Sequence, residues 1–209
     1  MPQDDDFAVE PIPGLPEVPP EGEEILWQGR PNAWVLAREA LNVDWVAGYF
    51  VFLTLWRMVS VIDLVPFGQA VASALPMLIV GAVACLLLLG MAWIQARATV
   101  YTITSSRVVM RIGAALTLTL NLPYTQIANA VLDVRKDGSG TIALETLGKT
   151  RLSIFVLWPH NRPWRFNPTQ PALRCIPDVA HVAGLLSQAA EARIAVPQVA
   201  RIDDAVPAE

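Results

Sequence analysis

The chain has 209 residues, which leaves room for one compact soluble module beside a membrane hairpin of about 60 residues and excludes two soluble domains. Charged residues make up only 16% of it, against roughly 25% in average soluble proteins, and the deficit falls between residues 41 and 96. The net charge of -4 hides an asymmetry, because residues 1–25 carry eight acids and no base whereas residues 97–193 carry eleven bases and five acids. A fully soluble chain is therefore excluded.

The N-terminal segment predicts disorder followed by a surface helix. Residues 1–22 form an acidic, proline-rich tail with too few large apolar side chains to offset the cost of ordering. They also lack the basic and apolar regions of a secretory signal peptide, so the N-terminus is expected in the cytoplasm. Residues 23–42 follow as an extended segment and an amphipathic helix capped by Asn32. Trp34 and Trp45 are expected at headgroup depth on the membrane surface.

Residues 43–96 predict a hairpin of two membrane-spanning helices. The first begins near residues 41–45, ends near Ile62 and is interrupted by Arg57. The second, residues 71–94, contains no formal charge and is longer than the roughly 20 apolar residues that a span needs. Arginines precede the first span and follow the second, and the turn between them contains no Lys or Arg. The positive-inside rule therefore places both termini in the cytoplasm.

Residues 97–193 predict a mostly β module closed by a helix. Their apolar residues alternate with period two, which is typical of antiparallel strands, and Asp137 to Gly140 has the composition of a hairpin turn. Strands are expected at residues 99–104, 107–112, 116–122, 130–136, 141–147, 151–157 and 173–175. A helix over residues 178–192 presents Val179, Val182, Leu186 and Ala189 on one face. The fold class is therefore α+β: the hairpin, then a small antiparallel β barrel closed by one C-terminal helix, with residues 194–209 as a disordered tail.

The sequence contains no pattern that indicates catalysis. His160 and His181 have no partner at ligand spacing, and a structural or surface role is expected for both. Cys85 falls in the second span and Cys175 in the β module, so no disulfide between them and no metal pattern is expected. The chain is predicted not to be an enzyme and to hold no catalytic, cofactor or metal site.

Six residues are candidates for contacts with partner proteins or lipids: Arg57, Trp34, Arg38, Arg162, Trp164 and Arg165. Arg57 either extends its charge to the nearby membrane surface or meets an acidic or polar group of a partner membrane protein. The last three lie in a predicted loop, residues 160–168, which is either a binding surface or an ordinary loop packed on the module. The bases of residues 97–193 are either a solvated surface or attracted to anionic headgroups.

Several motifs resemble known families. The first hairpin of the β module and the entry to its closing helix resemble those of bacterial pleckstrin-homology domains, in YTITSSRVV (residues 101–109) and RCIPDV (residues 174–179). With GEEILWQGRP (residues 22–31) and the pairs Tyr49-Phe50 and Trp56-Arg57, the chain resembles the photosynthetic-complex assembly proteins of purple phototrophic bacteria. The resemblance covers roughly residues 20–192.

The resemblance implies a pleckstrin-homology-like barrel in a non-enzymatic factor that helps to assemble the photosynthetic reaction centre and its core light-harvesting antenna. Subunits of those complexes and membrane lipids are the implied partners, with self-association as a further alternative and no nucleic acid. The implied location is the bacterial inner, intracytoplasmic photosynthetic membrane. The motif residues are structural, so no binding site is carried over, and Arg107 alone is too few bases for a phosphate pocket. The alternative is a membrane-tethered lipid-headgroup or scaffold module unrelated to photosynthesis.

Overall fold

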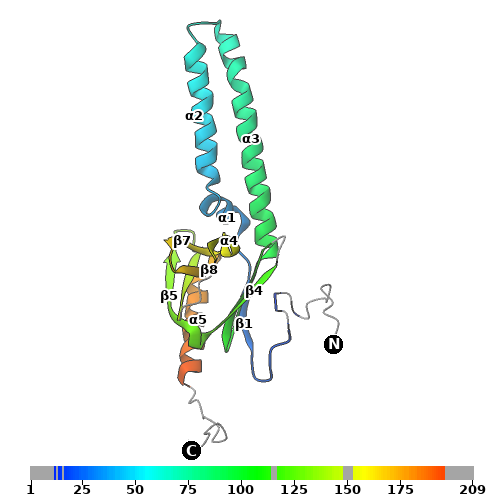
Figure 1. The fold of residues 1–209 in the computed structure, drawn as a ribbon, viewed down its shortest axis with the longest axis vertical. Helices are drawn as coiled ribbons and strands as arrows, with labels where there is room; N and C mark the ends of the chain where they lie inside the picture. Colours follow the sequence, from blue (N-terminus) through cyan, green and yellow to red (C-terminus); the bar gives the residue numbers. More distant parts are fainter. Residues whose placement is uncertain (1–11, 13, 16, 114–116, 148–152, 196–209) are drawn as a thin grey trace, which may run out of the picture.

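Two long helices stand side by side on a β module that lies at one end of the molecule (Figure 1). The structure is a computed structural model, and it describes residues 12, 14, 15, 17–113, 117–147 and 153–195. Helix α1 (Ala33–Glu39) lies at the foot of the pair formed by α2 (Val43–Val61) and α3 (Phe67–Ala98), and α2 and α3 run antiparallel.

The two long helices differ in their suitability as membrane spans. Within the described residues α3 alone is long and apolar enough to cross a bilayer, and it continues through Pro76. Helix α2 carries Asp44 in its first turn and Arg57 near its end. The helices approach closely at Gly81 of α3, where an added Cβ would lie 2.5 Å from Cβ of Phe50 on α2. The small-residue contact sets the spacing of the pair.

A larger side chain at Gly81 should separate the two helices. We expect Gly81→Leu to cost about 1–3 kcal/mol of stability, because Phe50 leaves no room for the new atoms. Spin labels on α2 and α3 should report a longer, broader distance distribution in this variant. Gly90→Leu is the matched control, since nothing lies within 4 Å of a Cβ at Gly90 on the same helix. An equal shift in both variants would contradict the packing described here.

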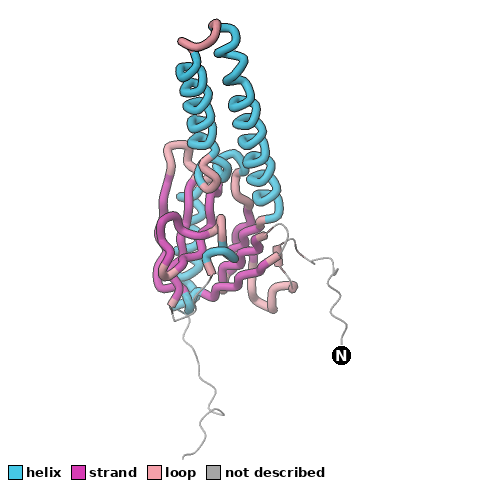
Figure 2. Tube along the Cα trace, turned by 45° about the horizontal axis from the view of Figure 1, so that its top comes forward, coloured by secondary structure: helices cyan, strands magenta, loops and turns pink. Residues whose placement is uncertain are grey.

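The β module consists of two four-stranded sheets. The first has the order β1 (Ile25–Gly29), β2 (Val100–Thr104), β3 (Arg107–Ile112), β4 (Leu118–Pro123). The second has the order β5 (Ile127–Val134), β6 (Gly140–Thr146), β8 (Thr169–Ile176), β7 (Asn161–Phe166). A turn of 3-10 helix, η1 (Tyr124–Gln126), leads from the first sheet to the second. Figure 2 shows the strands gathered below the two long helices.

Helix α5 (Val179–Ala195) covers the opening between the sheets. Its predicted apolar face is confirmed: Val179, Val182, Leu186 and Ala189 are all buried in the main core. The rest of that core comes from both sheets, from Tyr124 of η1 and from Leu157, and the sheets contribute Tyr101, Met110, Ile142 and Leu173 among others. One helix therefore joins two sheets into one hydrophobic core.

Most of the predicted elements are confirmed. Strands occur where the period-two runs predict them, at β2, β3, β4, β5 and β6. The side chain of Asn32 accepts hydrogen bonds from the backbone N–H groups of Trp34 (3.0 Å) and Val35 (3.2 Å), so the predicted N-cap is also confirmed. The helix that it begins ends at Glu39, slightly earlier than the expected end near Leu41.

Three predictions about the second half of the module are wrong. The described strands form two sheets and not a closed barrel, because η1 separates β4 from β5 and no hydrogen bonds join them. The expected strand at residues 151–157 is instead the short helix α4 (Ile154–Leu157), with residues 151 and 152 outside the described residues. An uninterrupted apolar run fits either structure. The expected loop at residues 160–168 contains β7, an edge strand that tolerates Pro163.

The N-terminal segments also differ from the expected division of the chain. Strand β1 belongs to the first sheet, with Gly29 opposite Tyr101, although it was assigned to the segment before the hairpin. Leu15, in the expected disordered tail, is instead fully buried, and Glu23, in the expected extended segment, pairs with Arg107 on β3 (2.8 Å). Most of the remaining tail, residues 1–11, 13 and 16, lies outside the described residues. The β module therefore includes chain from both sides of the hairpin.

Candidate functional site

An open cleft of about 610 Å3 lies where the two long helices meet the β module. We call it the junction cleft. It is lined by Trp34, Val35, Arg38 and Glu39 of α1, Asn42, Asp44 and Trp45 at the start of α2, Arg135 and Asp137 beside the β5–β6 turn, and Pro163 and Trp164 of β7. Three of these residues are strongly exposed tryptophans: Trp34 (59%), Trp45 (80%) and Trp164 (89%). The cleft thus combines a polar floor with an aromatic edge.

The charges of the junction cleft are largely paired. Nε of Arg38 lies 2.7 Å from Oδ2 of Asp44, and Nε of Arg135 lies 3.1 Å from Oε1 of Glu39. The Asp137 carboxylate accepts hydrogen bonds from the hydroxyl and backbone N–H of Ser139, and these bonds lower its pKa. With its bases already paired to acids, the cleft does not form the cluster of bases that a phosphate pocket requires.

The structure brings together three of the six candidate residues. Trp34, Arg38 and Trp164 line the junction cleft. Arg162 instead donates to Oε1 of Gln170 (3.0 Å) and lies 3.7 Å from Glu145, and Arg165 lines a separate shallow cleft with Glu145 and Gln170. Arg57 lies exposed near the far end of α2.

Beneath the junction cleft, a buried polar cluster joins the helices to the module. His160, fully buried, lies 2.6 Å from the Tyr101 hydroxyl through Nδ1 and 3.1 Å from Oγ1 of Thr99 through Nε2. The Tyr101 oxygen also accepts the backbone N–H of Arg174 (3.3 Å). Through Nε2 the imidazole of His160 reaches Thr99, the C-cap residue of α3.

Burial controls the charge states in this cluster. It lowers the pKa of His160 to about 3, with a further contribution from the nearby Arg174 charge, and it raises the pKa of Tyr101. The Arg174 guanidinium donates to the backbone oxygens of Pro159 (3.0 Å) and Glu39 (3.3 Å). His160 is therefore neutral at physiological pH and connects structural elements, as its expected structural role requires.

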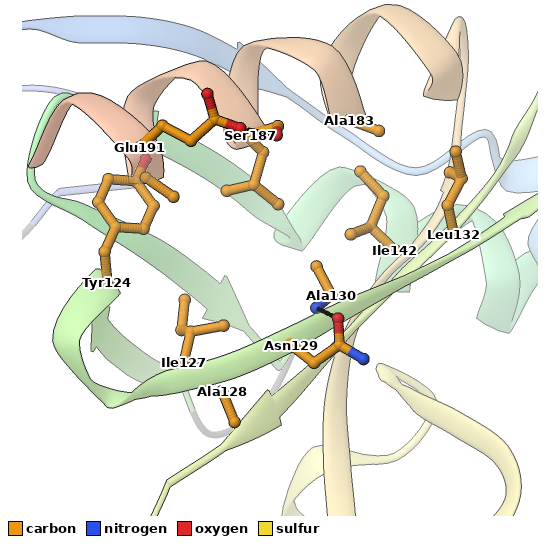
Figure 3. Close-up of a pocket in the computed structure, with 12 residues that line it drawn as sticks. Tyr124, Ile127, Ala128, Asn129, Ala130, Leu132, Ile142, Ala183, Ser187 and Glu191 are labelled. Atoms are coloured by element: carbon orange, nitrogen blue, oxygen red, sulfur yellow. Dashed lines mark hydrogen bonds between the residues drawn. The ribbon is translucent and has the colours of Figure 1, made fainter. Parts of the chain in front are cut away.

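A second, more apolar groove runs between α5 and the β5 edge of the second sheet. It encloses about 320 Å3, and its labelled lining includes Tyr124, Ile127, Leu132 and Ile142 (Figure 3). The two polar side chains that α5 contributes to this groove are hydrogen-bonded to each other: the Ser187 hydroxyl donates to Glu191 (3.2 Å). Among the described residues, no three His, Cys, Asp or Glu side chains are grouped so that they could hold a metal ion.

Sequence reasoning missed Arg135 and Asp137 as cleft residues. Both lie beside the β5–β6 turn, about 100 residues from α1 in sequence, and only the packing of α1 on the module brings them together. Trp45 was placed at the membrane surface, but its position in the same cleft as Trp164 was not foreseen.

Comparison with known proteins identifies the family. The family described as Bacterial PH domain matches residues 49–190, from within α2 to within α5. The chain belongs to the bacterial PH domain family. The matched residues include β2 to β8 and most of α5, and the match also takes in most of the helical pair.

One relative of this bacterial PH domain protein matches over nearly its whole length. It is an uncharacterized 23.7 kDa protein in the puhA 5' region of Rhodobacter capsulatus, 48% identical over 200 residues, which cover 94% of this chain and 92% of that protein. No solved structure matches the chain.

Proposed function

We propose that the chain is a non-enzymatic assembly factor for the photosynthetic reaction centre and its core light-harvesting antenna, the counterpart of the assembly protein PuhB. The observation that carries the proposal is the near full-length relative in the puhA 5' region of Rhodobacter capsulatus, which suggests a link to a photosynthesis gene neighbourhood. The exposed helical pair offers a surface for partner subunits.

The proposal includes a two-span topology, and the pairing of β1 with β2 supports it. Strand β1 precedes the helical pair and β2 follows it, yet Gly29 lies opposite Tyr101 in one sheet. If α3 crosses the bilayer, the chain has to cross it a second time for the two strands to meet. Within the described residues between these strands, α2 is the other long helix, with 19 residues or about 28 Å at 1.5 Å per residue. Both ends of the hairpin then face the cytoplasm, in the intracytoplasmic photosynthetic membrane.

The exposed face of α2 is the surface on which we expect a partner to dock. Trp45, Tyr49, Phe52 and Trp56 follow one another at helical spacing, and each is more than half exposed. Arg57 adjoins this stripe and makes no ion pair within the described part of the chain. An unpaired charge inside a span is costly, so an acidic group on a partner helix is the matching chemistry.

The decisive experiment is deletion of the gene in its native phototroph. We expect the membranes of the deletion strain to lose the absorbance of the reaction centre and core antenna, while other membrane proteins remain at normal levels. Normal assembly in that strain would refute the proposal. It would favour instead the alternative, a membrane-tethered lipid-headgroup or scaffold module.

The same strain tests the docking surface. Complementation with Arg57→Leu should restore a membrane-inserted protein that no longer co-purifies with reaction-centre or antenna subunits, because removing one member of a desolvated charge pair costs about 2–5 kcal/mol of binding. Arg57→Lys, which keeps the charge, should retain most of the co-purification. Equal recovery of partners with wild type and Arg57→Leu would show that Arg57 makes no such contact.

A further inference from the structure

Most of the exposed tryptophans of the chain lie around the foot of the helical pair. The chain contains seven tryptophans. Six of them are exposed. Trp56 lies near the far end of α2, and the other five lie where the elements meet: Trp34, Trp45, Trp93, Trp158 and Trp164. Trp34, Trp45 and Trp164 line the junction cleft, and Trp93 lies near the end of α3, where the Arg97 guanidinium stacks 4.7 Å from its ring centre. Tryptophans and flanking arginines at one level mark the interface between a bilayer and water.

The short helix α4 adds two large apolar side chains to this region. Leu157 is buried in the main core and holds α4 to the module. The two preceding residues point outward: Phe155 is 91% exposed and Val156 is 54% exposed. Trp158, the next residue after α4, is 44% exposed. Helix α4 thus packs on the module through Leu157 and presents an apolar face that no described residue covers.

Hydrogen bonds place α4 next to the end of α3. Pro159, two residues after α4, accepts from the Arg174 guanidinium, which also donates to the backbone of Glu39 at the end of α1. His160 contacts Thr99, where α3 ends. Figure 1 shows α4 directly beneath α1, at the end of the β module from which the long helices rise.

The length of α3 indicates what lies against the apolar face of α4. Its 32 residues extend about 48 Å at 1.5 Å per residue, whereas the hydrocarbon core of a bilayer is about 30 Å thick. If α3 crosses the bilayer, the part of it beyond the core, about 18 Å, extends past the core at one or both ends, so its last turn, beside α4, lies at or near the headgroup layer. A lipid surface is then close enough to be the apolar partner of Phe155, Val156 and Trp158.

We propose that Trp34, Trp45, Phe155, Val156, Trp158 and Trp164 form a docking rim that lies in the headgroup layer of the leaflet from which α3 emerges. The rim holds the β module against the membrane through α4 and β7, in addition to its covalent connection through α3. The proposal depends on α3 crossing the bilayer and is independent of any role in photosynthesis. It assigns α4 a membrane contact that the helical pair alone does not require.

The test measures the depth of α4 in proteoliposomes that contain only the full-length chain and phospholipid. A nitroxide label is placed at Phe155→Cys or, as control, at Gln188→Cys, an exposed position on α5, both in a Cys85→Ala, Cys175→Ala background. We expect the label at position 155 to be several-fold more accessible to oxygen, relative to a water-soluble nickel chelate, than the label at position 188. Equal ratios at the two positions would overturn the proposal.

A second variant tests whether the rim acts as one surface. A label at Trp164→Cys should also show a high ratio of oxygen to nickel accessibility, and adding Phe155→Glu should lower that ratio, because a charge on α4 opposes insertion. Both residues are exposed, so neither change removes a core contact. An unchanged ratio at position 164 would contradict a single docking surface. Loss of access to both reagents at position 155 would indicate a protein contact there and would also contradict the proposal.

Discussion

Acidification from about pH 6.5 to about pH 4 should destabilise the folded β module by on the order of 3 kcal/mol through His160 alone. The pKa of this histidine falls from its usual 6.5 to about 3 in the folded chain, because the buried site excludes the charged form. Between those two values the unfolded chain binds a proton that the folded chain does not. The stability that depends on a neutral His160 is therefore fully present above pH 6.5. It is lost as the pH falls toward 3, by about 1.4 kcal/mol per pH unit.

Thermal unfolding of the detergent-solubilised protein at several pH values measures this effect, and the two histidines of the chain provide a matched pair. His160→Gln should lower stability at pH 7, since it disturbs the bonds to Tyr101 and Thr99, but it should flatten the dependence on pH. His181→Gln, on the exposed side of α5, should keep the wild-type slope. If His160→Gln retains the full slope, another group causes the acid sensitivity.

Replacing Gly140 by alanine should cost about 2–3 kcal/mol, because the site has no space for one more carbon. A Cβ there would meet the backbone oxygen of Asp133 and would lie 2.6 Å from Cγ1 of Val179. Gly140 begins β6, where it pairs with Val134 on one side and Ile176 on the other, and Val179 begins α5. Relief of the clash would have to move either the β5–β6 ladder or the helix that joins the two sheets.

Gly184→Ala is the control for this prediction. Gly184 lies in α5 with nothing within 4 Å of an added Cβ, so alanine should stabilise the helix there by about 0.5–1 kcal/mol. Chemical denaturation followed by circular dichroism should give changes of opposite sign for the two variants. A loss below about 0.5 kcal/mol in Gly140→Ala would mean that the strands and α5 adjust to the extra atom easily.

The elements that sequence reasoning found are those whose signal is local. The alternating residues of β2 and β3, the turn at residues 137–140 and the apolar face of α5 each depend on neighbours a few positions away. The prediction for residues 154–157 failed because four consecutive apolar residues have no period. Strand β7 was missed because it contains Pro163 and pairs irregularly with β8. Its position at the sheet edge, which permits these features, is a property of the tertiary structure.

The candidate site was predicted by residue type but not by arrangement. Tryptophan and arginine are common in binding surfaces, which was sufficient to select Trp34, Arg38 and Trp164. That Trp34 and Trp164 line the same cleft follows from the packing of α1 on the module, and no local pattern encodes this packing. The same limit explains why Arg162, paired with Gln170 and Glu145, was grouped with Trp164 although it lies outside the cleft.

The position of β1 also determines the order in which the protein can be completed. During synthesis β1 leaves the ribosome before the helical pair, and its partner β2 leaves only after α3. Until then β1 is a strand without a neighbour, and Trp27, which packs against the main core, has no core to join. The first sheet can be finished only when both helices have reached positions that bring Gly29 and Tyr101 together. The first sheet is therefore completed only in chains whose helices are correctly placed. A chain with a misplaced helix retains an exposed strand edge that chaperones and proteases can recognise.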